Sequence, residues 1–173
     1  GFAYVIVRKD LLAACEGNAR SLSLDLYDQW KTMNVDGKWR FTSPTHVVLA
    51  FAKAMEELEA EGGITARHER YAANEKLLRK KLSALGFVPF LEQEVQGPII
   101  TTFYYPDGCN FSFQEMYDYI KERGYILYPG KTTKAETFRV GNIGEIYQED
   151  IDKVAGLLSD FLDSKRNLQA KGA

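Results

Sequence analysis

Cysteine and histidine are scarce in this sequence of 173 residues, which has two of each. Cys15 and Cys109 provide no disulfide framework of the kind found in small secreted domains. His46 and His68 have no neighbouring cysteine or histidine at the spacing of a zinc site. The sequence therefore predicts no metal site, and a reducing cytoplasm is the default compartment for such a chain.

Strong charge of one sign and long apolar runs are also lacking. The formal net charge of −2 gives no electrostatic reason to bind nucleic acid or an anionic membrane surface. No apolar run approaches the roughly 18–20 residues that span a bilayer. With 45% apolar and 27% charged residues, the composition is that of an ordinary globular protein. We therefore expect neither a nucleic-acid partner nor a membrane partner.

The first seven residues (GFAYVIV) are almost all apolar and predict a buried strand. No initiator methionine, signal peptide or targeting segment stands before them. Because a natural chain rarely starts inside a strand, we expect that an upstream part is missing.

Two helices, followed by alternating strands and helices, are predicted after this segment. Apolar residues at helical spacing predict a helix with Ser43 as N-cap and Pro44 as first residue, and a second helix over residues 65–85. The Gly62-Gly63 pair between these helices is the candidate domain boundary. Strands are predicted at residues 87–90, 99–105, 125–128 and 137–140, and helices at residues 113–123 and 150–163. The pattern predicts an α/β fold with helices on one face of a small sheet.

A first candidate site is the segment Thr42-Ser43-Pro44-Thr45 at the start of a predicted helix. Free N–H groups and the helix dipole favour an anion there, and the hydroxyl groups add donors. Plain N-capping is the alternative, because serine and threonine are common caps.

A second candidate is Arg139 in the predicted strand 137–140. Side chains alternate along a strand, so Arg139 lies on the face opposite to Phe138 and Val140. It is a candidate fork for a carboxylate or phosphonate; a structural ion pair and an edge-strand arginine are the alternatives.

Other polar residues are interpreted as solvated. Lys131 has no sign of the burial or cationic neighbour that would activate it as a Schiff-base lysine, so we interpret it as a loop lysine. The carboxylates of Glu56, Glu57, Glu59 and Glu61 are expected to form a solvated helix face.

The order of five motifs along the chain resembles the class V pyridoxal-phosphate aminotransferases and, within them, the 2-aminoethylphosphonate:pyruvate transaminases. These motifs are residues 1–6 (GFAYVI), 21–27 (SLSLDLY), 40–46 (RFTSPTH), 125–131 (YILYPGK) and 138–145 (FRVGNIGE). The resemblance covers nearly the whole chain, up to about Leu162.

This resemblance implies a fold, a homodimer, a cofactor and a substrate with an acidic group. The family has the aspartate-aminotransferase fold (PLP fold type I), with a large and a smaller C-terminal α/β domain, and acts as a homodimer. Residues 1–62 would then end the large domain, and residues 63–173 would form the small domain. The resemblance implies that Thr42 reaches the pyridoxal 5'-phosphate of the other subunit, with Trp39 and Ser43 beside it. It implies that Arg139 binds the acidic group of the substrate, chiefly the carboxylate of pyruvate or alanine.

The resemblance also implies what this chain lacks. In the family, the Schiff-base lysine and the aspartate that pairs with the pyridine nitrogen precede the strand that opens the chain. We expect the full-length protein to transfer the amino group of 2-aminoethylphosphonate to pyruvate, in phosphonate degradation, and this chain alone to be inactive. The alternatives are another class V aminotransferase, such as an alanine–glyoxylate type, and a non-catalytic α/β dimerisation module.

Overall fold

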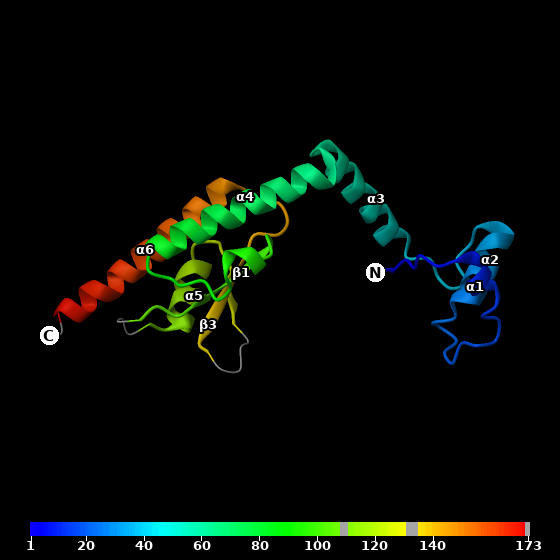
Figure 1. The fold of residues 1–173 in the computed structure, drawn as a ribbon, viewed down its shortest axis with the longest axis horizontal. Coiled ribbons are helices and arrows are strands. Elements are labelled where there is room, and N and C mark those ends of the chain that lie inside the picture. Colours follow the sequence, from blue (N-terminus) through cyan, green and yellow to red (C-terminus); the bar gives the residue numbers. More distant parts are fainter. Residues whose placement is uncertain (108–110, 131–134, 172–173) are drawn as a thin grey trace. The chain divides into compact units, whose positions relative to one another are not determined.

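The computed structural model describes residues 1–107, 111–130 and 135–171, with side chains as far as residue 167. It forms two compact units, Gly1–Ala60 and Glu61–Ala173 (Figure 1). The division lies next to Gly62 and Gly63, which have φ values of 106° and 80° in the left-handed region that favours glycine. None of the described helices has the length and apolar character needed to cross a bilayer.

The first unit contains three helices and no buried side chain. The helices are α1 (Lys9–Ala13), α2 (Leu26–Asp36) and α3 (Thr45–Ala60). The Asp25 carboxylate caps α2 by accepting the Asp28 N–H at 3.0 Å. All residues from 1 to 60 are described, and none of them is buried. This unit therefore has no hydrophobic core of its own.

Residues 1–7 form no strand, so the prediction of a buried strand there is wrong for this structure. Tyr4, Val5 and Ile6 are 75%, 58% and 93% exposed. A strand satisfies its backbone N–H and C=O groups by pairing with a neighbour, and no described strand pairs with this segment. The apolar side chains on which the strand prediction rested are therefore exposed to solvent.

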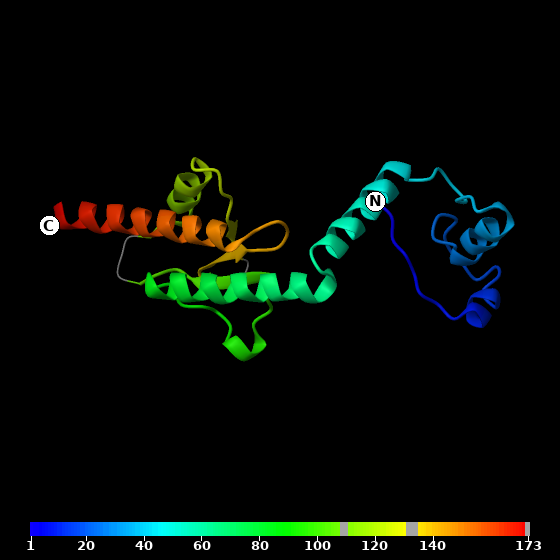
Figure 2. The same cartoon turned by 90° about the horizontal axis from the view of Figure 1, so that it is seen from above.

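The second unit packs helices against an antiparallel sheet of three strands among the described residues. Its helices are α4 (Gly63–Ala84), α5 (Phe113–Lys121) and α6 (Gln148–Lys171), with a 3₁₀ helix at Gln93–Val95. The strands are β1 (Ile100–Tyr104), β2 (Tyr128–Pro129) and β3 (Thr137–Gly141), in the order β1-β3-β2. Figures 1 and 2 show α4 and α6 side by side, running in the same direction over the sheet.

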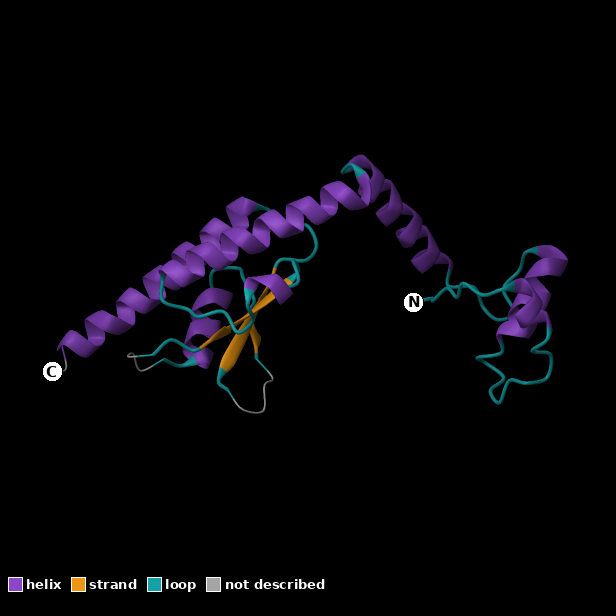
Figure 3. Ribbon diagram, viewed as in Figure 1, coloured by secondary structure: helices purple, strands orange, loops and turns teal. Residues whose placement is uncertain are grey.

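The core of this unit lies between one face of the sheet and the three helices. Phe103 of β1 and Phe138 of β3 are fully buried, with ring centroids 5.8 Å apart, and Phe87 approaches Phe138 at 5.2 Å. The helices contribute buried apolar side chains: Leu78, Leu82, Met116, Ile120, Ile151, Val154, Leu158, Phe161 and Leu162. The predicted fold class, an α/β fold with helices on one face of a small sheet, is confirmed (Figure 3).

Several predicted element boundaries are wrong. Helix α3 begins at Thr45, because the Pro44 carbonyl accepts the first helical hydrogen bond, from the Val48 N–H at 3.0 Å. The Ser43 hydroxyl lies 3.3 Å from the Thr45 hydroxyl, so the predicted N-cap is one residue early. Residues 87–90 make only an isolated bridge through Pro89, and β2 includes only the last residue of the predicted strand 125–128. Helix α6 continues past the predicted end at residue 163.

Gly130 is required by a close approach of backbone to backbone after β2. Its N–H donates to the Thr137 carbonyl at 2.7 Å, and a Cβ at this position would overlap that carbonyl group and the Thr137 hydroxyl. We expect Gly130→Ala to lower the free energy of unfolding by about 1–3 kcal/mol, measured by urea denaturation, because the backbone must shift. Gly97→Ala is the control: a Cβ at Gly97 meets nothing within 4 Å. Equal effects of the two substitutions would contradict this prediction.

Candidate functional site

Arg139 lies in the middle of the central strand, on the sheet face opposite to the helices. Its cross-strand partners are Thr102 in β1 and Tyr128 in β2. The side chain is half-buried, and its Nε donates to the Pro129 carbonyl at 3.2 Å. This hydrogen bond uses one of the five guanidinium N–H groups and fixes the plane of the fork.

The two structural alternatives for Arg139 do not hold in the part of the chain that the structure describes. Strand β3 is the central strand, so Arg139 is not at a sheet edge. No described carboxylate forms an ion pair with it. A half-buried arginine without an anionic partner is suited to bind an anion from solution.

The surface around Arg139, here called the open face, is mostly apolar with three hydroxyl groups. Ile100, Tyr104 and Phe90 are 41%, 36% and 38% exposed, and the Phe90 and Tyr104 rings lie 5.3 Å apart. Tyr128 is 57% exposed, and Thr102 is half-buried beside the guanidinium. An apolar surrounding strengthens a charge-assisted hydrogen bond to a bound carboxylate or phosphonate, because less water competes for the fork.

The loop that follows β3 is fixed to α4 by side-chain hydrogen bonds. The buried Asn142 amide donates to the carbonyls of Tyr71, at 3.2 Å, and Pro98, at 2.8 Å. The Gly144 N–H donates to the Tyr71 hydroxyl at 3.0 Å. The Asn74 amide donates to the Ile146 carbonyl at 2.7 Å. These contacts hold the C-terminal end of the strand that carries Arg139.

Glu61 is not part of a solvated helix face, and that prediction is wrong for this residue. Its carboxylate accepts from Arg67 Nε at 2.7 Å and from Arg70 Nε at 2.6 Å, and its side chain is 21% exposed. The hydrogen bond from Arg70, and next the one from Arg67, hold the pKa of Glu61 below its ordinary value of 4.5. The prediction grouped Glu61 with the preceding glutamates of one helix face, whereas the two arginines that bind it come from the following helix, α4.

The lowered pKa of Glu61 predicts a pH dependence of stability. The folded state holds the proton less tightly than the unfolded state, so the carboxylate stabilises the fold fully above about pH 4.5. This stabilisation is lost as the pH falls through the lower pKa of the folded state. We expect the difference in unfolding free energy between the native chain and Glu61→Gln to be constant from pH 7 to 5 and to shrink below. A difference that grows on acidification would contradict this assignment.

Thr42 lies on the short segment between α2 and α3, next to the N-terminus of α3. Arg40 fixes this segment: its Nη1 donates to the Leu22 carbonyl at 2.7 Å, and its Nη2 lies 3.1 Å from the Asp28 carboxylate. Thr42 and Ser43 are exposed, and the half-buried Trp39 meets the Phe2 ring edge-on at 6.4 Å. The exposed Thr42 hydroxyl beside a helix N-terminus is a geometry that can hold a phosphate.

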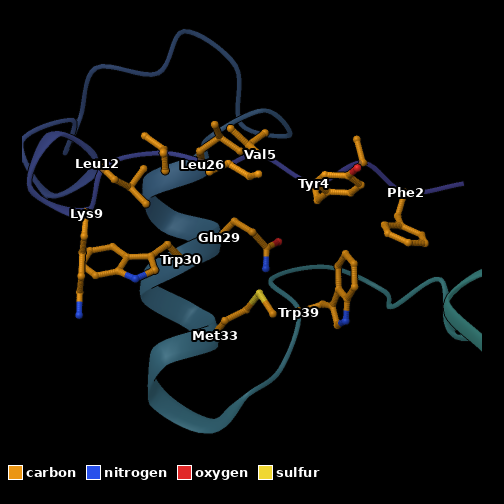
Figure 4. A pocket seen from close by; sticks show the side chains of 13 residues that line it. Phe2, Tyr4, Val5, Lys9, Leu12, Leu26, Gln29, Trp30, Met33 and Trp39 are labelled. Atoms are coloured by element: carbon orange, nitrogen blue, oxygen red, sulfur yellow. The ribbon is translucent and has the colours of Figure 1, made fainter. Parts of the chain in front are cut away.

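The first unit also has an apolar groove of about 780 Å³. Figure 4 shows Phe2, Tyr4 and Val5 of the N-terminal segment along one side of it, with Gln29 and Met33 of α2 and Trp39 nearby. The Gln29 side-chain nitrogen is buried without a hydrogen-bond partner in the described residues. The groove is therefore an exposed apolar surface that contains a hydrogen-bond donor without an acceptor among the described residues.

The structure brings Trp39, Thr42 and Ser43 together on one segment of the first unit and places Arg139 in the second unit. Lys131 lies outside the described residues. Sequence reasoning missed Asn142 and Asn74 as residues that hold the loop after β3. The available signal was weak: Asn142 directly follows the strand, and Asn74 is a polar residue on the apolar stripe of α4.

Solved structures with a similar fold are aminotransferases. The chain superposes with ureidoglycine–glyoxylate aminotransferase from Bacillus subtilis at a TM-score of 0.73 and 20% identity, over 91% of this chain and 41% of that one. An alanine–glyoxylate aminotransferase from Nostoc sp. gives 0.69 and 20%, over 83% and 39%. A subgroup IV aspartate aminotransferase from Thermus thermophilus gives 0.67 and 23%, over 84% and 40%. The fold is therefore part of the aspartate-aminotransferase-like fold.

Curated relatives give a narrower assignment. The chain is 52% identical over 167 residues to 2-aminoethylphosphonate–pyruvate transaminase of Lysinibacillus sphaericus, which is 96% of this chain and 45% of the relative. It is 56% identical over 155 residues to the protein of the same name from Bacillus cereus, covering 89% and 42%. The chain belongs to this transaminase family and matches its C-terminal part. It spans less than half the length of these relatives, and no protein-family model matches it.

Proposed function

We propose that this chain is the part of a pyridoxal-phosphate-dependent transaminase that binds the acidic group of the substrate. The reaction of the whole protein is amino transfer from 2-aminoethylphosphonate to pyruvate, giving phosphonoacetaldehyde and L-alanine. The observation that carries the proposal is Arg139, a half-buried arginine without an anionic partner among the described residues, at the centre of the open face. The sequence relatives bear the name of this reaction.

The role of Arg139 follows from its fork. Pyruvate and alanine carry a carboxylate, and 2-aminoethylphosphonate carries a phosphonate at the end opposite to its amino group. A planar guanidinium donates two parallel hydrogen bonds to either anion, and each charge-assisted bond contributes roughly 1.5–3 kcal/mol. Binding the acidic end in this way orients the amino or keto carbon toward the reaction centre.

The residues of the first unit fit the phosphate of the cofactor. Thr42 offers an exposed hydroxyl donor beside the N-terminus of α3, and Arg40 holds the segment in place. Trp39 and Ser43 complete the segment. When bound, pyridoxal 5'-phosphate supplies the electron sink for amino transfer. By resemblance, Thr42 serves the cofactor of the other subunit of a homodimer, and the Schiff-base lysine belongs to the part of the family that this chain does not span.

The exposed apolar residues of the first unit support its assignment to a larger domain. With no buried side chain among residues 1–60, the unit exposes Tyr4, Val5 and Ile6 and an apolar groove. Such an uncovered surface needs a covering element. We assign residues 1–62 to the end of the large domain and residues 63–173 to the small domain. The working compartment is the cytoplasm.

The substrate assignment is tested by assaying the whole protein with each donor and acceptor. We expect 2-aminoethylphosphonate with pyruvate to give a kcat/KM at least about tenfold above alanine with glyoxylate. The reverse preference would show an alanine–glyoxylate type instead. No amino transfer with either pair would indicate a non-catalytic module and overturn the proposal.

The present chain is expected to have no amino-transfer activity by itself. The 173-residue chain should be incubated with pyridoxal 5'-phosphate and then separated from free cofactor by gel filtration. We expect the protein fraction to carry no cofactor absorbance. A stable, lysine-dependent absorbance band accompanied by turnover would contradict the assignment of the cofactor lysine to the rest of the protein.

A further inference from the structure

We propose that Arg70 is a positioning residue: it helps to position Arg139 by fixing the loop after β3 to the start of α4. The proposal rests on the proposed function, because that function gives Arg139 its role. It adds that the geometry of the acidic-group site depends on a side chain outside that site. Arg70 itself touches neither β3 nor the open face in the contacts described below.

The Arg70 guanidinium contacts a carboxylate, two backbone carbonyls and two aromatic rings. Its Nε donates to Glu61 at 2.6 Å, and its Nη1 donates to the carbonyls of Gly144, at 2.8 Å, and Ile146, at 2.9 Å. The rings of Tyr71 and Tyr147 each lie 5.0 Å from its central carbon. Lysine cannot reproduce this arrangement, because an ammonium lacks the planar fork and the extended face.

The loop is short enough to transmit a displacement to the strand. Gly144 is three residues beyond Gly141, the last residue of β3, and Gly141 is two residues from Arg139. Consecutive Cα atoms are about 3.8 Å apart and the backbone does not stretch. Between these residues, Asn142 is buried and bonded to Tyr71 and Pro98. Loss of the Arg70 bonds leaves the loop held by Asn142, Asn74 and the Tyr71 hydroxyl, so the C-terminal end of β3 is loosened rather than freed.

The other end of the Arg70 contact lies at the junction before α4. Glu61 directly precedes Gly62 and Gly63, both with left-handed φ values. A Cβ on Gly62 would lie 2.9 Å from the Ala66 Cβ, so this turn is closely packed. Arg70 thus joins the start of the second unit to the loop that ends β3, and it fixes the position of Arg139 relative to that junction.

Arg67 provides a matched control within the same ion-pair cluster. It donates to Glu61 at 2.7 Å, as Arg70 does at 2.6 Å, but no hydrogen bond joins it to the loop after β3 in the described residues. Arg70→Lys removes the loop contacts, whereas Arg67→Lys weakens only the contact with Glu61. A difference between the two variants therefore isolates the positioning role.

Amide hydrogen exchange and NMR of the 173-residue chain test this directly. In Arg70→Lys we expect the amides of residues 142–147 to exchange about tenfold faster, and the Arg139 Nε–Hε signal to shift, while amides of α5 keep their rates. Arg67→Lys should match the native chain in all three readouts. Equal behaviour of the two variants, or equal acceleration in α5, would overturn the proposal, because either result would show a merely structural effect.

Kinetics of the whole protein separate this proposal from the proposed function. We expect Arg70→Lys to raise the KM for pyruvate roughly fivefold and to change kcat less than twofold, because the loss lies in binding. An unchanged KM in Arg70→Lys, in an enzyme whose Arg139→Lys variant is impaired, would overturn the positioning role. If Arg139→Lys is not impaired, the proposed function fails, whatever the exchange experiment shows.

Discussion

Backbone amides of residues 1–60 should exchange at least about a thousandfold faster than the core amides of the second unit when the 173-residue chain is placed in D₂O. The first unit has no buried side chain, and its helices α1, α2 and α3 are 5, 11 and 16 residues long. Isolated helices of about this length are marginal in water, so little free energy opposes their opening. The second unit encloses a continuous core of buried side chains.

The comparison of α3 with α4 is the sharpest part of this experiment. The two helices are consecutive and of 16 and 22 residues, but only α4 has buried side chains, among them Leu78 and Leu82. We expect slow exchange along the buried face of α4 and fast exchange throughout α3. Equal protection in the two helices would show that the first unit is stable alone and would contradict its assignment to an incomplete domain.

Phe138→Ala should cost about 3–5 kcal/mol of unfolding free energy, which is a large share of the total for a unit of this size. Phe138 is fully buried, and its ring packs against those of Phe87, Phe103 and Phe111. Removing it leaves a cavity directly behind Arg139 on the central strand. Urea denaturation, followed by far-UV circular dichroism, measures the loss.

Phe90→Ala is the matched control for this substitution. Phe90 is 38% exposed on the open face and has a ring contact with Tyr104. We expect a smaller loss, of about 1–2 kcal/mol, because the partly exposed ring buries less apolar surface than Phe138 and its removal leaves no enclosed cavity. Similar losses in the two variants would contradict the assignment of the core to the helix-covered face.

Most of the fold that could be predicted from the sequence was predicted from helical periodicity. The stripe of α6 was predicted correctly because Ile151, Val154 and Leu158 all face one core. The strand over residues 1–7 was predicted wrongly because strand formation depends on a partner that local sequence does not contain. Strand β2 (Tyr128–Pro129) contains only the last residue of the predicted strand 125–128 and extends one residue beyond it.

The candidate site was predictable only in part. Alternation along the strand indicated which face Arg139 occupies, but its central place depends on the strand order β1-β3-β2, which sequence does not reveal. The roles of Glu61 and Arg70 depend on contacts up to 76 residues apart in the chain. Long-range hydrogen bonds of this kind leave no local pattern.

Amino transfer to pyruvate by the whole protein, compared between Arg139→Lys and Arg123→Lys, tests the central claim most directly. Lysine keeps the charge of Arg139 and removes the fork, so we predict a loss of kcat/KM of about a hundredfold, or roughly 2.7 kcal/mol of transition-state stabilisation. Arg123 is an exposed arginine over the Tyr119 ring, and its substitution should change kcat/KM less than twofold. An Arg139→Lys enzyme within twofold of the native one would contradict the account.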